Sequence, residues 1–456
     1  MKQYDNIIIG FGKGGKTLAG ALTKAGQSVA LIERDPNMYG GTCINVACIP
    51  TKSLEYSARM SAAQGGDFAG KAERYRAAVA GKNRLTAMLR QKNYDKVITA
   101  GAEVYTGVAA FVDEHHISVA YPDGSAEEME GARFFLNTGS RPFVPPVKGL
   151  ADSKFVYTSE TLMSQDVLPK RLAIIGGGYI GLEFSSYFTN FGSEVTVIQN
   201  GDTFIPREDR EVAESVLDSL TARGVHVLQS AATKEVRDEK DHAALVLEYN
   251  GAETLVEADA ILVATGRRPN LADLNLEAAG VELTSRGAVK TDEHLCTSVP
   301  HIWAMGDVAG GLQFTYILLD DFRIVKSHLL GDGGRTTANR GEVPYTVFLD
   351  PPMSRVGLSE EEALQKGYEI KIARLAAGAI PKAQVLQKSV GLLKAIVNAE
   401  NGMILGAHFF CAESQEMINL VKLCMDANLP YTVLRDNIFN HPTMSESLND
   451  LFGTLE

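Results

Sequence analysis

The sequence predicts an α/β protein that contains two Rossmann-like domains. Two stretches, Tyr4–Asp35 and Arg171–Asn200, each combine an apolar strand, a glycine-rich turn, a helix and a second apolar strand. The chain has 456 residues, too many for one hydrophobic core, so two or three domains are expected. Hydrophobic residues make up 45% and charged residues 22% of the chain, as in an ordinary globular protein.

The first stretch has every element of a dinucleotide-binding βαβ unit. An apolar strand over Asn6–Ile9 leads into a GxGxxG turn made by Gly10, Gly12 and Gly15. Glycine is needed where the turn is tight and where the backbone must approach a pyrophosphate, which then meets the free N–H groups at the helix N-terminus. The second strand ends at Glu33, whose carboxylate can accept hydrogen bonds from both hydroxyls of an adenosine ribose. A purely structural βαβ turn is the alternative.

The second stretch repeats this pattern. Its glycines, at the spacing of the first triplet, are Gly176, Gly178 and Gly181. The second strand ends at Gln199, so an amide stands where the first copy has an acid. Two dinucleotide folds in one chain imply two dinucleotides, one FAD and one nicotinamide nucleotide.

Charge and hydropathy exclude two classes of partner. The formal net charge of −12 argues against a nucleic-acid partner, because phosphate binding needs a basic surface. No stretch reaches the roughly 18 uninterrupted apolar residues that a membrane span needs. The N-terminal MKQYDNIIIG has an apolar run of three residues, too short for a signal peptide. We therefore expect a cytoplasmic protein.

A close pair of cysteines, Cys43 and Cys48, marks the candidate reaction centre. In a reducing compartment such a pair points to catalysis or metal binding. Helix-forming sequence follows from about Pro50, so the helix N-terminus can stabilise a Cys48 thiolate, and Lys52 adds positive charge one turn later. No further Cys or His lies nearby, so we expect no metal. The other cysteines are expected to be inert core thiols: Cys296, Cys411 and Cys424.

Together these motifs resemble the class I pyridine nucleotide–disulfide oxidoreductases, the family of glutathione reductase, lipoamide dehydrogenase and mercuric reductase. The resemblance extends from the first strand to the last ten residues. It implies a homodimer with a shared active site and a C-terminal α+β dimerisation domain. The implied order is an FAD-binding domain, an NAD(P)H-binding domain, a return to the FAD-binding domain and the interface domain, over residues 1–145, 146–268, 269–338 and 339–456.

The resemblance assigns roles to the dithiol and its neighbours. Cys48 would lie against the flavin as the charge-transfer thiol, and Cys43 would be the interchange thiol that meets the substrate. Lys52 would lie near flavin N5, paired with Glu183, and Tyr179 would cover the nicotinamide pocket. Without the family, Tyr179 and Glu183 would be interpreted as part of an ordinary amphipathic helix.

The resemblance also implies further cofactor contacts. Two segments, LNTGSRP and ILVATGRRPN, look like paired crossing points between domains. A carboxylate after Gly306, in Asp307, can bind a ribityl hydroxyl of the flavin, although an isolated Gly-Asp is more often a plain turn. The additional FAD contacts are Gly41, Thr42, Lys52, Thr138 and Gly139, and the additional NAD(P)H contact is Gly266.

Near the C-terminus, His441 and Glu446 match the family's His-Pro-Thr and Glu positions. The carboxylate would fix the imidazole tautomer and stabilise its cation. The imidazole, supplied by the partner subunit, would then exchange a proton with Cys43. Alone, a His beside a Pro is more often structural.

Four stretches resemble the bacterial reactive-chlorine-resistance branch, which includes enzymes regarded as hypothiocyanous acid reductases: FTYILLDDFRIV, VFLDPPMSRVGLSE, IPKAQVL and NHPTMSESLNDLF. The implied substrate is a small oxidant such as hypothiocyanous acid or a reactive chlorine species, and Cu(II) reduction is also attributed to the branch. The alternatives are a dihydrolipoamide dehydrogenase or another disulfide reductase. A mercuric reductase or a high-molecular-weight thioredoxin reductase is disfavoured, because the chain ends without a cysteine pair.

Two positions depart from common patterns. Gln199 offers no charge to a 2′-phosphate, and Arg207 and Arg210 lie several residues further on, so we expect NADH to be preferred over NADPH. Ala47 stands where the family usually has Gly. If that position required a positive φ, Ala would add strain of about 1 kcal/mol.

Overall fold

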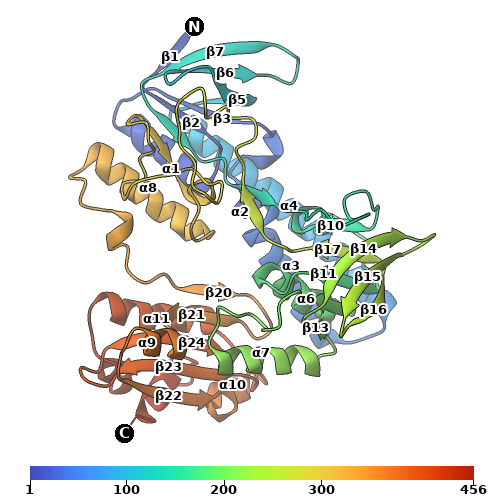
Figure 1. The fold of residues 1–456 in the computed structure, drawn as a ribbon. Coiled ribbons are helices and arrows are strands. Elements are labelled where there is room, and N and C mark those ends of the chain that lie inside the picture. Colours follow the sequence, from blue (N-terminus) through green and yellow to red (C-terminus); the bar gives the residue numbers. More distant parts are fainter. Residues whose placement is uncertain (456) are drawn as a thin grey trace. The chain divides into compact units, whose positions relative to one another are not determined.

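The computed structural model describes residues 1–455, which form two compact units (Figure 1). Unit 1 consists of Met1–Ser53, Ala78–Phe143 and Gly266–Arg340. Unit 2 consists of Leu54–Ala77, Val144–Thr265 and the chain from Gly341 onwards. Two long helices, α3 (Cys48–Gln64) and α4 (Phe68–Thr99), contribute residues to both units. The domain boundaries expected from the sequence remain predictions.

The core of unit 1 is a parallel five-stranded sheet in the order β19-β8-β2-β3-β4. Its strands are β2 (Asn6–Ile9), β3 (Val29–Glu33), β4 (Glu103–Thr106), β8 (Phe134–Leu136) and β19 (Ile302–Ala304). Strand β2 is buried along its whole length, as is typical of a strand covered on both faces. Helix α1 (Lys13–Lys24) connects β2 to β3 and packs beside α8 (Thr315–Leu330) (Figure 1). This is the Rossmann arrangement that the first glycine-rich stretch predicts.

Unit 1 also has a four-stranded sheet in the order β1-β7-β6-β5. Its strands are β1 (Lys2–Tyr4), β5 (Val108–Phe111), β6 (His116–Ala120) and β7 (Ala126–Gly131). The two Thr-Gly segments pair with each other as antiparallel strands β9 (Ser140–Pro142) and β18 (Arg267–Pro269). The short helices of unit 1 are α2 (Thr42–Val46) and the 3₁₀ turns η1 (Pro36–Met38), η2 (Gly306–Ala309) and η3 (Thr337–Asn339).

Unit 2 contains the second Rossmann-like sheet, a parallel sheet in the order β10-β17-β11-β12-β13. Its strands are β10 (Val156–Thr158), β11 (Arg171–Ile175), β12 (Glu194–Ile198), β13 (His226–Leu228) and β17 (Ala260–Val263). Helix α6 (Tyr179–Phe191) connects β11 to β12, as the second glycine-rich stretch predicts. The remaining elements of this part are α5 (Ser159–Leu162), α7 (Arg210–Ala222), β14 (Ala232–Asp238), β15 (Ala243–Tyr249) and β16 (Ala252–Ala258).

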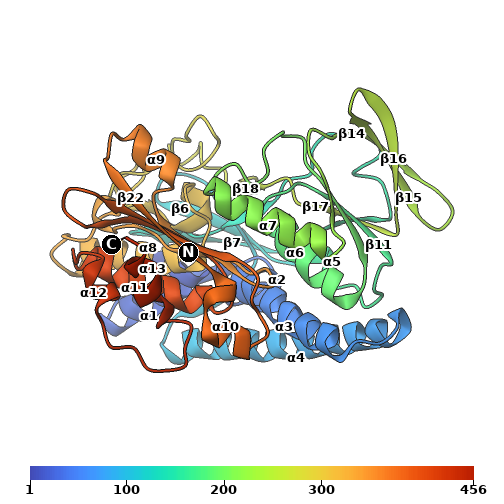
Figure 2. The same cartoon turned by 90° about the horizontal axis from the view of Figure 1, so that it is seen from below.

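The C-terminal part of unit 2 is an antiparallel five-stranded sheet in the order β20-β21-β24-β23-β22, with helices α11 and α13 packed against it (Figure 2). Its strands are β20 (Tyr345–Val347), β21 (Met353–Gly357), β22 (Ile370–Ala376), β23 (Leu392–Asn398) and β24 (Ile404–Phe410). Its helices are α9 (Glu360–Gln365), η4 (Ala377–Ala379), α10 (Pro381–Val385), α11 (Ser414–Asp426), α12 (Thr432–Arg435) and α13 (Ser447–Gly453). The two parallel sheets and this α+β part confirm the predicted fold class.

Among the described residues 1–455, the helices are too short or too polar to cross a lipid bilayer.

A buried lysine connects α7 to the C-terminal sheet of unit 2. The Lys394 side chain on β23 is 2% exposed. Its Nζ lies 2.9 Å from a carboxylate oxygen of Asp209 and 2.9 Å from Glu211 Oε1, and a third carboxylate, Glu360, is 2.6 Å away. Removing the ammonium would leave the buried carboxylate of Asp209 without a counter-charge, beside the partly exposed carboxylates of Glu211 and Glu360. This costs far more than losing an exposed ion pair.

We therefore predict that Lys394→Met lowers the free energy of unfolding by about 3–5 kcal/mol. Lys290→Met is the matched control, because the Lys290–Glu282 pair is exposed on both sides and should contribute little to the free energy of unfolding. Urea denaturation followed by fluorescence gives both values. Equal effects of the two substitutions would contradict the prediction.

Candidate active site

The two cysteines of the predicted dithiol lie on consecutive helices. Cys43 is the second residue of α2, and Cys48 is the first residue of α3, which starts slightly earlier than the sequence suggests. Both are free thiols, and their side chains are hydrogen-bonded to each other. The structure therefore describes the dithiol form of the pair. Of the other cysteines, Cys411 and Cys424 are buried, and Cys296 is half-buried.

The residue between the two helices does not have the conformation expected from a glycine. Ala47 has φ −141° and ψ −105°, so its φ is negative. The condition under which Ala47 would add strain, a positive φ, is therefore not met.

Cys43 holds its proton more tightly than an ordinary thiol. The hydrogen bond with Cys48 raises the pKa of Cys43, and burial and the charge of Cys48 raise it further. Thr315 and Lys16 act in the opposite direction. Thr315, the first residue of α8, has its Oγ1 3.3 Å from the Cys48 Sγ. The hydrogen bond with Cys48 and burial therefore favour the protonated form of Cys43.

The dithiol segment packs directly against the first glycine-rich turn. Gly41, which precedes α2, has φ +85°, and a Cβ there would lie 2.7 Å from the Gly12 Cα. Gly139, after β8, has φ +70°, and its Cβ position is 4.0 Å from the Thr42 Oγ1. The structure thus brings Gly12, Gly41, Thr42 and Gly139 together around the start of α2.

This region of unit 1 fits an FAD molecule. Gly10 has φ +106°, and Glu33, below the turn, accepts hydrogen bonds from the backbone N–H groups of Phe11 and Asp35 at 3.0 and 3.3 Å. Thr138 Oγ1 is buried and has no hydrogen-bond partner among the described residues. A glycine-lined turn, an acid at the end of β3 and an unused hydroxyl are what a bound dinucleotide requires.

Asp307 is held by two residues from the paired Thr-Gly segments. Its Oδ2 accepts a hydrogen bond from the Ser140 hydroxyl at 2.6 Å, and the Arg267 Nε donates to the same hydroxyl oxygen at 2.9 Å. Burial raises the pKa of Asp307, whereas the Ser140 hydrogen bond and the Arg267 charge lower it. Ser140 and Arg267 therefore favour an ionised carboxylate at a buried position.

The second glycine-rich turn in unit 2 has an amide above it. A Cβ on Gly177 would lie 2.4 Å from Gln199 Oε1, so the Gln199 side chain lies over the turn. The Gln199 Nε2 donates to the carbonyls of Gly201 and Thr203 at 3.2 and 2.6 Å. Gly176 has φ +115°, and a Cβ on Gly181 would lie 2.1 Å from the Gly176 carbonyl oxygen, so the turn is close-packed there. Beyond its own helix and chain neighbours, Gly178 has no described protein atom within 4 Å of its Cβ position, which leaves space that fits a nicotinamide dinucleotide. Gly266, the remaining predicted glycine, belongs to unit 1.

The two predicted side chains of α6 have partners from the C-terminal sheet. Glu183 Oε1 accepts a hydrogen bond from the Phe348 backbone N–H at 3.0 Å, and the Tyr179 hydroxyl lies 3.2 Å from that of Tyr345. Lys52 belongs to unit 1 and Glu183 to unit 2. Their predicted ion pair remains a prediction.

His441 and Glu446 form a hydrogen-bonded pair in unit 2. The His441 Nδ1 lies 2.9 Å from Glu446 Oε2, and Glu446 Oε1 also accepts from the Thr443 N–H at 3.1 Å. The hydrogen bond with His441 lowers the pKa of Glu446. The His441 side chain is 72% exposed in the single chain, whereas that of Glu446 is 20% exposed. The carboxylate orients the ring and leaves Nε2 directed away from it.

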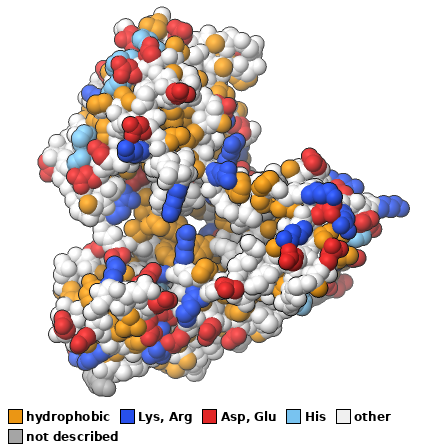
Figure 3. All heavy atoms as spheres, in the orientation of Figure 1, with side chains coloured by type: hydrophobic (Ala, Val, Ile, Leu, Met, Phe, Trp, Pro, Cys, Tyr) orange, Lys and Arg blue, Asp and Glu red, His pale blue; other side chains and the backbone are white. Residues whose placement is uncertain are grey.

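Histidines also gather on the surface of unit 1 (Figure 3). The His115 and His301 rings stack with centroids 4.2 Å apart, and the His294 and His328 rings are 4.8 Å apart. Within residues 1–455, no three His, Cys, Asp or Glu side chains are arranged to hold a metal ion.

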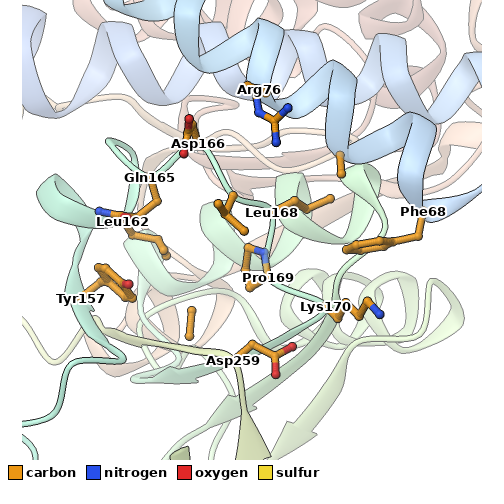
Figure 4. A pocket seen from close by; sticks show the side chains of 13 residues that line it. Phe68, Arg76, Tyr157, Leu162, Gln165, Asp166, Leu168, Pro169, Lys170 and Asp259 are labelled. Carbon is orange, nitrogen blue, oxygen red and sulfur yellow. The ribbon is translucent and has the colours of Figure 1, made fainter. Parts of the chain in front are cut away.

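A cavity of about 400 Å³ lies in unit 2 (Figure 4). Tyr157, Leu162, Pro169 and Asp259 line it together with the N-terminal part of α4. It includes none of the predicted site residues. The lining is mixed, with Arg76 and Lys170 as its cations.

Comparison with protein families shows to which family the chain belongs. Residues 4–320 match the pyridine nucleotide-disulphide oxidoreductase family, and residues 343–452 match the dimerisation domain of the same family. The chain belongs to this family. It is accordingly an oxidoreductase of a family that uses FAD and a nicotinamide nucleotide, and the resemblance seen in the sequence is confirmed.

Curated relatives cover several activities of the family. The chain is 46% identical over 457 residues to the probable pyridine nucleotide-disulfide oxidoreductase RclA of Escherichia coli K12, covering 100% of both chains. It is 34% identical to a mercuric reductase of Staphylococcus aureus, covering 98% of this chain and 81% of the relative. It is 30% identical to the dihydrolipoyl dehydrogenase of Bacillus subtilis, covering 97% and 94%.

Solved structures agree with this assignment. The HOCl-induced flavoprotein disulfide reductase RclA from Escherichia coli superposes with a TM-score of 0.93 at 45% identity, covering 99% of this chain and 100% of that chain. The Cu(II) complex of the same reductase superposes with a TM-score of 0.94 at 45% identity and full coverage of both chains.

Several site residues were missed in the sequence. Asn137 accepts a hydrogen bond from the Gly15 N–H and donates to the Met305 carbonyl, both at 2.9 Å. Ser140 and Arg267 hold Asp307, and Thr315 contacts Cys48. Ser140 and Arg267 stand in the two paired segments, and that symmetry was the one available signal. The other contacts join distant segments that share no spacing pattern.

Lys16 was also missed. It lies on α1 directly after the last glycine of the first turn, and its Nζ donates to the Gly40 carbonyl at 2.9 Å. Burial lowers the pKa of Lys16 to about 8, assisted by the charges of Lys13 and Lys96, and Cys43 opposes this shift. Below pH 8 the side chain is therefore a buried ammonium beside the loop that leads to Cys43.

We predict that Lys16→Met slows alkylation of Cys43 by iodoacetamide about two- to tenfold below pH 8, because the ammonium favours the thiolate. The difference should disappear above about pH 8, where Lys16 itself loses its proton. The rate is measured on the NADH-reduced enzyme by mass spectrometry of the Cys43 peptide.

Lys24→Met, in the last turn of the same helix, is the matched control and should leave the rate unchanged. An identical pH profile for the parent and Lys16→Met would contradict an influence of Lys16 on Cys43.

Proposed function

We propose that this chain is a homodimeric, FAD-dependent NAD(P)H oxidoreductase of the cytoplasm that reduces a small oxidant through Cys43 and Cys48. The substrate class is hypothiocyanous acid or reactive chlorine species, and the role is defence against oxidative stress. The observation that supports this best is the hydrogen-bonded thiol pair placed against a dinucleotide-binding turn. The full-length similarity to the HOCl-induced reductase of Escherichia coli supports the substrate class.

The proposed reaction of the dithiol with hypothiocyanous acid balances without a further reactant. The Cys43 sulfur attacks the sulfur of hypothiocyanous acid, an S–S bond forms, the O–S bond breaks, and the thiol proton leaves with the hydroxide as water. The Cys48 thiolate then attacks the Cys43 sulfur, which closes the disulfide and releases thiocyanate. FAD, when bound in unit 1, would pass two electrons from NAD(P)H to the Cys43–Cys48 disulfide and so regenerate the dithiol.

The chain's own residues divide this work. Cys43 meets the oxidant, and Cys48 resolves the intermediate. Thr315 is a hydrogen-bonding partner of Cys48, and Ser140 holds the Asp307 carboxyl group that would meet the ribityl chain of the flavin. Arg267 in turn donates to the Ser140 hydroxyl. Lys52, paired with Glu183, would place a positive charge near flavin N5.

We also propose the domain order expected from the sequence. The FAD-binding domain comprises residues 1–145 and 269–338, the NAD(P)H-binding domain residues 146–268 and the interface domain residues 339–456. The match of residues 343–452 to a dimerisation domain supports the last assignment.

Two other activities define the alternatives. A dihydrolipoamide dehydrogenase would use the same dithiol on a carrier-bound substrate, and the relative of Bacillus subtilis supports this alternative at 30% identity. Reduction of Cu(II) is a second candidate substrate reaction, since the Escherichia coli reductase was solved as a Cu(II) complex.

Steady-state turnover distinguishes these reactions. We predict faster NADH oxidation with hypothiocyanous acid than with Cu(II), and little NAD⁺ reduction with dihydrolipoamide. Cys43→Ser and Cys48→Ser should abolish the first activity, whereas Cys296→Ser, a half-buried thiol outside the pair, should retain it. A dominant dihydrolipoamide activity would overturn the proposed substrate in favour of the carrier-dependent enzyme.

We propose that NADH is preferred over NADPH. Gln199 offers no positive charge, and the Arg210 guanidinium already donates to the carbonyls of Phe204 and Glu208 at 3.0 and 2.6 Å. A third donation, to the Ile205 carbonyl at 2.6 Å, leaves Arg210 committed to its own loop. Gln199 and Arg210 are therefore not arranged to neutralise a 2′-phosphate.

The expected kcat/KM is about tenfold higher with NADH, the value of one charge-assisted hydrogen bond. Gln199→Arg should reduce or reverse this ratio, while Gln365→Arg, on exposed α9, should not. A higher kcat/KM with NADPH in the parent enzyme would contradict the proposal.

We propose that His441 of the partner subunit exchanges a proton with Cys43 and that Glu446 orients it. The high exposure of His441 in the single chain and its hydrogen bond to Glu446 support this role. The raised pKa of Cys43 supports the need for a base.

His441→Ala should slow substrate turnover by about 10²–10⁴ while leaving flavin reduction by NADH nearly intact. Mixed dimers of Cys43→Ser and His441→Ala subunits test the shared site, because one of their two sites is undamaged. If such heterodimers are present and show no activity above the parent homodimers, the partner-subunit assignment is wrong.

A further inference from the structure

The Tyr179 hydroxyl is bound to a buried carboxylate. It donates a hydrogen bond to Glu208 Oε1 at 2.5 Å, and the Glu208 residue is 4% exposed. Glu208 lies just before α7, and Tyr179 is the first residue of α6. Burial and the charge of Glu208 both raise the pKa of Tyr179, so the phenol stays protonated and remains a donor.

A second tyrosine shares the same carboxylate oxygen. Tyr345, on β20 of the C-terminal sheet, donates to Glu208 Oε1 at 2.7 Å, and its hydroxyl is 3.2 Å from that of Tyr179. The two rings stack with centroids 5.6 Å apart and an interplanar angle of 30°. Tyr179 is therefore held both at its hydroxyl and along its ring.

Glu208 is itself held by other contacts. The Glu208 backbone carbonyl accepts a hydrogen bond from Arg210 at 2.6 Å, and the Glu208 N–H donates to the Ile205 carbonyl at 3.0 Å. The Arg355 guanidinium, which is 8% exposed as a residue, lies close enough for Glu208 to raise its pKa. A counter-charge and two backbone hydrogen bonds thus fix Glu208 in place.

We propose that Glu208 and Tyr345 are positioning residues that hold the Tyr179 ring in place and thereby set the affinity for the nicotinamide ring. The inference rests on the proposed function and on the role that the family resemblance gives to Tyr179, which is to cover the nicotinamide pocket. In this proposal the nicotinamide enters when the Tyr179 ring moves, and that movement breaks the hydrogen bond between Tyr179 and Glu208. The C-terminal sheet, through Tyr345, thereby influences how tightly the nucleotide binds.

The size of the effect follows from the lost bond. A hydrogen bond to a charged group corresponds to roughly ten- to one-hundredfold in an equilibrium constant. Because Tyr345 remains to satisfy Glu208 after Tyr179 leaves, we expect a smaller effect, about three- to thirtyfold. Removing the bond should therefore tighten nicotinamide binding by this factor.

The test compares two ligands that differ in the nicotinamide ring. The dissociation constants of NAD⁺ and ADP-ribose are measured by calorimetry on oxidised holoenzyme for Tyr179→Phe, Glu208→Gln and the double variant. Each single change should tighten NAD⁺ binding about three- to thirtyfold, the double variant should gain nothing further, and ADP-ribose affinity should stay constant. Tyr345→Phe should shift NAD⁺ affinity without altering that of ADP-ribose.

Tyr121→Phe is the matched control, since it removes a phenol that donates to Glu127 at 3.0 Å in unit 1. Flavin content and melting temperature confirm that each variant is folded, and the Tyr345→Phe variant keeps the test decisive if Glu208→Gln does not fold. Additive effects, unchanged NAD⁺ affinity or equal shifts for both ligands would overturn the inference. Failure of the parent enzyme to bind either ligand would instead contradict the proposed function.

Discussion

The close approach of three loops around the Asn137 side chain is the contact on which the arrangement of unit 1 depends. A Cβ on Gly10 would lie 2.3 Å from the Asn137 carbonyl oxygen, and one on Gly12 would lie 2.4 Å from its Oδ1. The same amide accepts from Gly15 and donates to Met305. The ends of β2, β8 and β19 are therefore joined by one side chain, so that the glycine-rich turn, Thr138 and the Gly306–Asp307 turn converge on one region of unit 1.

The two Rossmann-like parts use different chemistry at equivalent positions. Glu33 is an acceptor, and it accepts backbone N–H groups from the first turn and the following loop. Gln199 also has a donor, and it donates to carbonyls of the loop that follows β12. A carboxyl group and an amide would place different demands on a bound ribose. The difference between Glu33 and Gln199 agrees with the proposal that the first site retains a flavin and the second site binds and releases a nicotinamide nucleotide.

Local patterns in the sequence predicted the fold class and most of the candidate site. The glycine turns, the dithiol and the His-Pro-Thr segment each lie within a few consecutive residues, where spacing has a direct structural meaning. The partners of these residues could not be predicted in this way. Ser140 and Asp307 are 167 positions apart, and Tyr179 and Tyr345 are 166 apart. Such contacts are decided by tertiary packing, and a sequence pattern contains no record of them.

The conformation of Ala47 could not be predicted from the residue type either. Relatives usually have a glycine at this position, but a glycine can adopt a positive or a negative φ. The chain breaks the helix between Cys43 and Cys48 at Ala47, which has φ −141° and ψ −105°. The position of the two sulfurs thus depends on the helix break and on the packing of Gly41 against Gly12, not on a glycine before Cys48.

The state of the dithiol connects its electrostatics to the proposed chemistry. The hydrogen bond with Cys48 and burial raise the pKa of Cys43, the thiol that is proposed to meet the substrate, and so favour its protonated form. This is unfavourable for a simple nucleophile, because the thiolate is the reactive form. It suits an oxidant whose first leaving group is hydroxide, since that group needs a proton when the O–S bond breaks. An acid–base group that removes the proton from sulfur and returns it to oxygen satisfies both requirements. The Glu446-oriented imidazole of the partner subunit's His441 has that capacity in the proposed dimer, and Lys16 and Thr315 reduce the cost of the transient Cys43 thiolate.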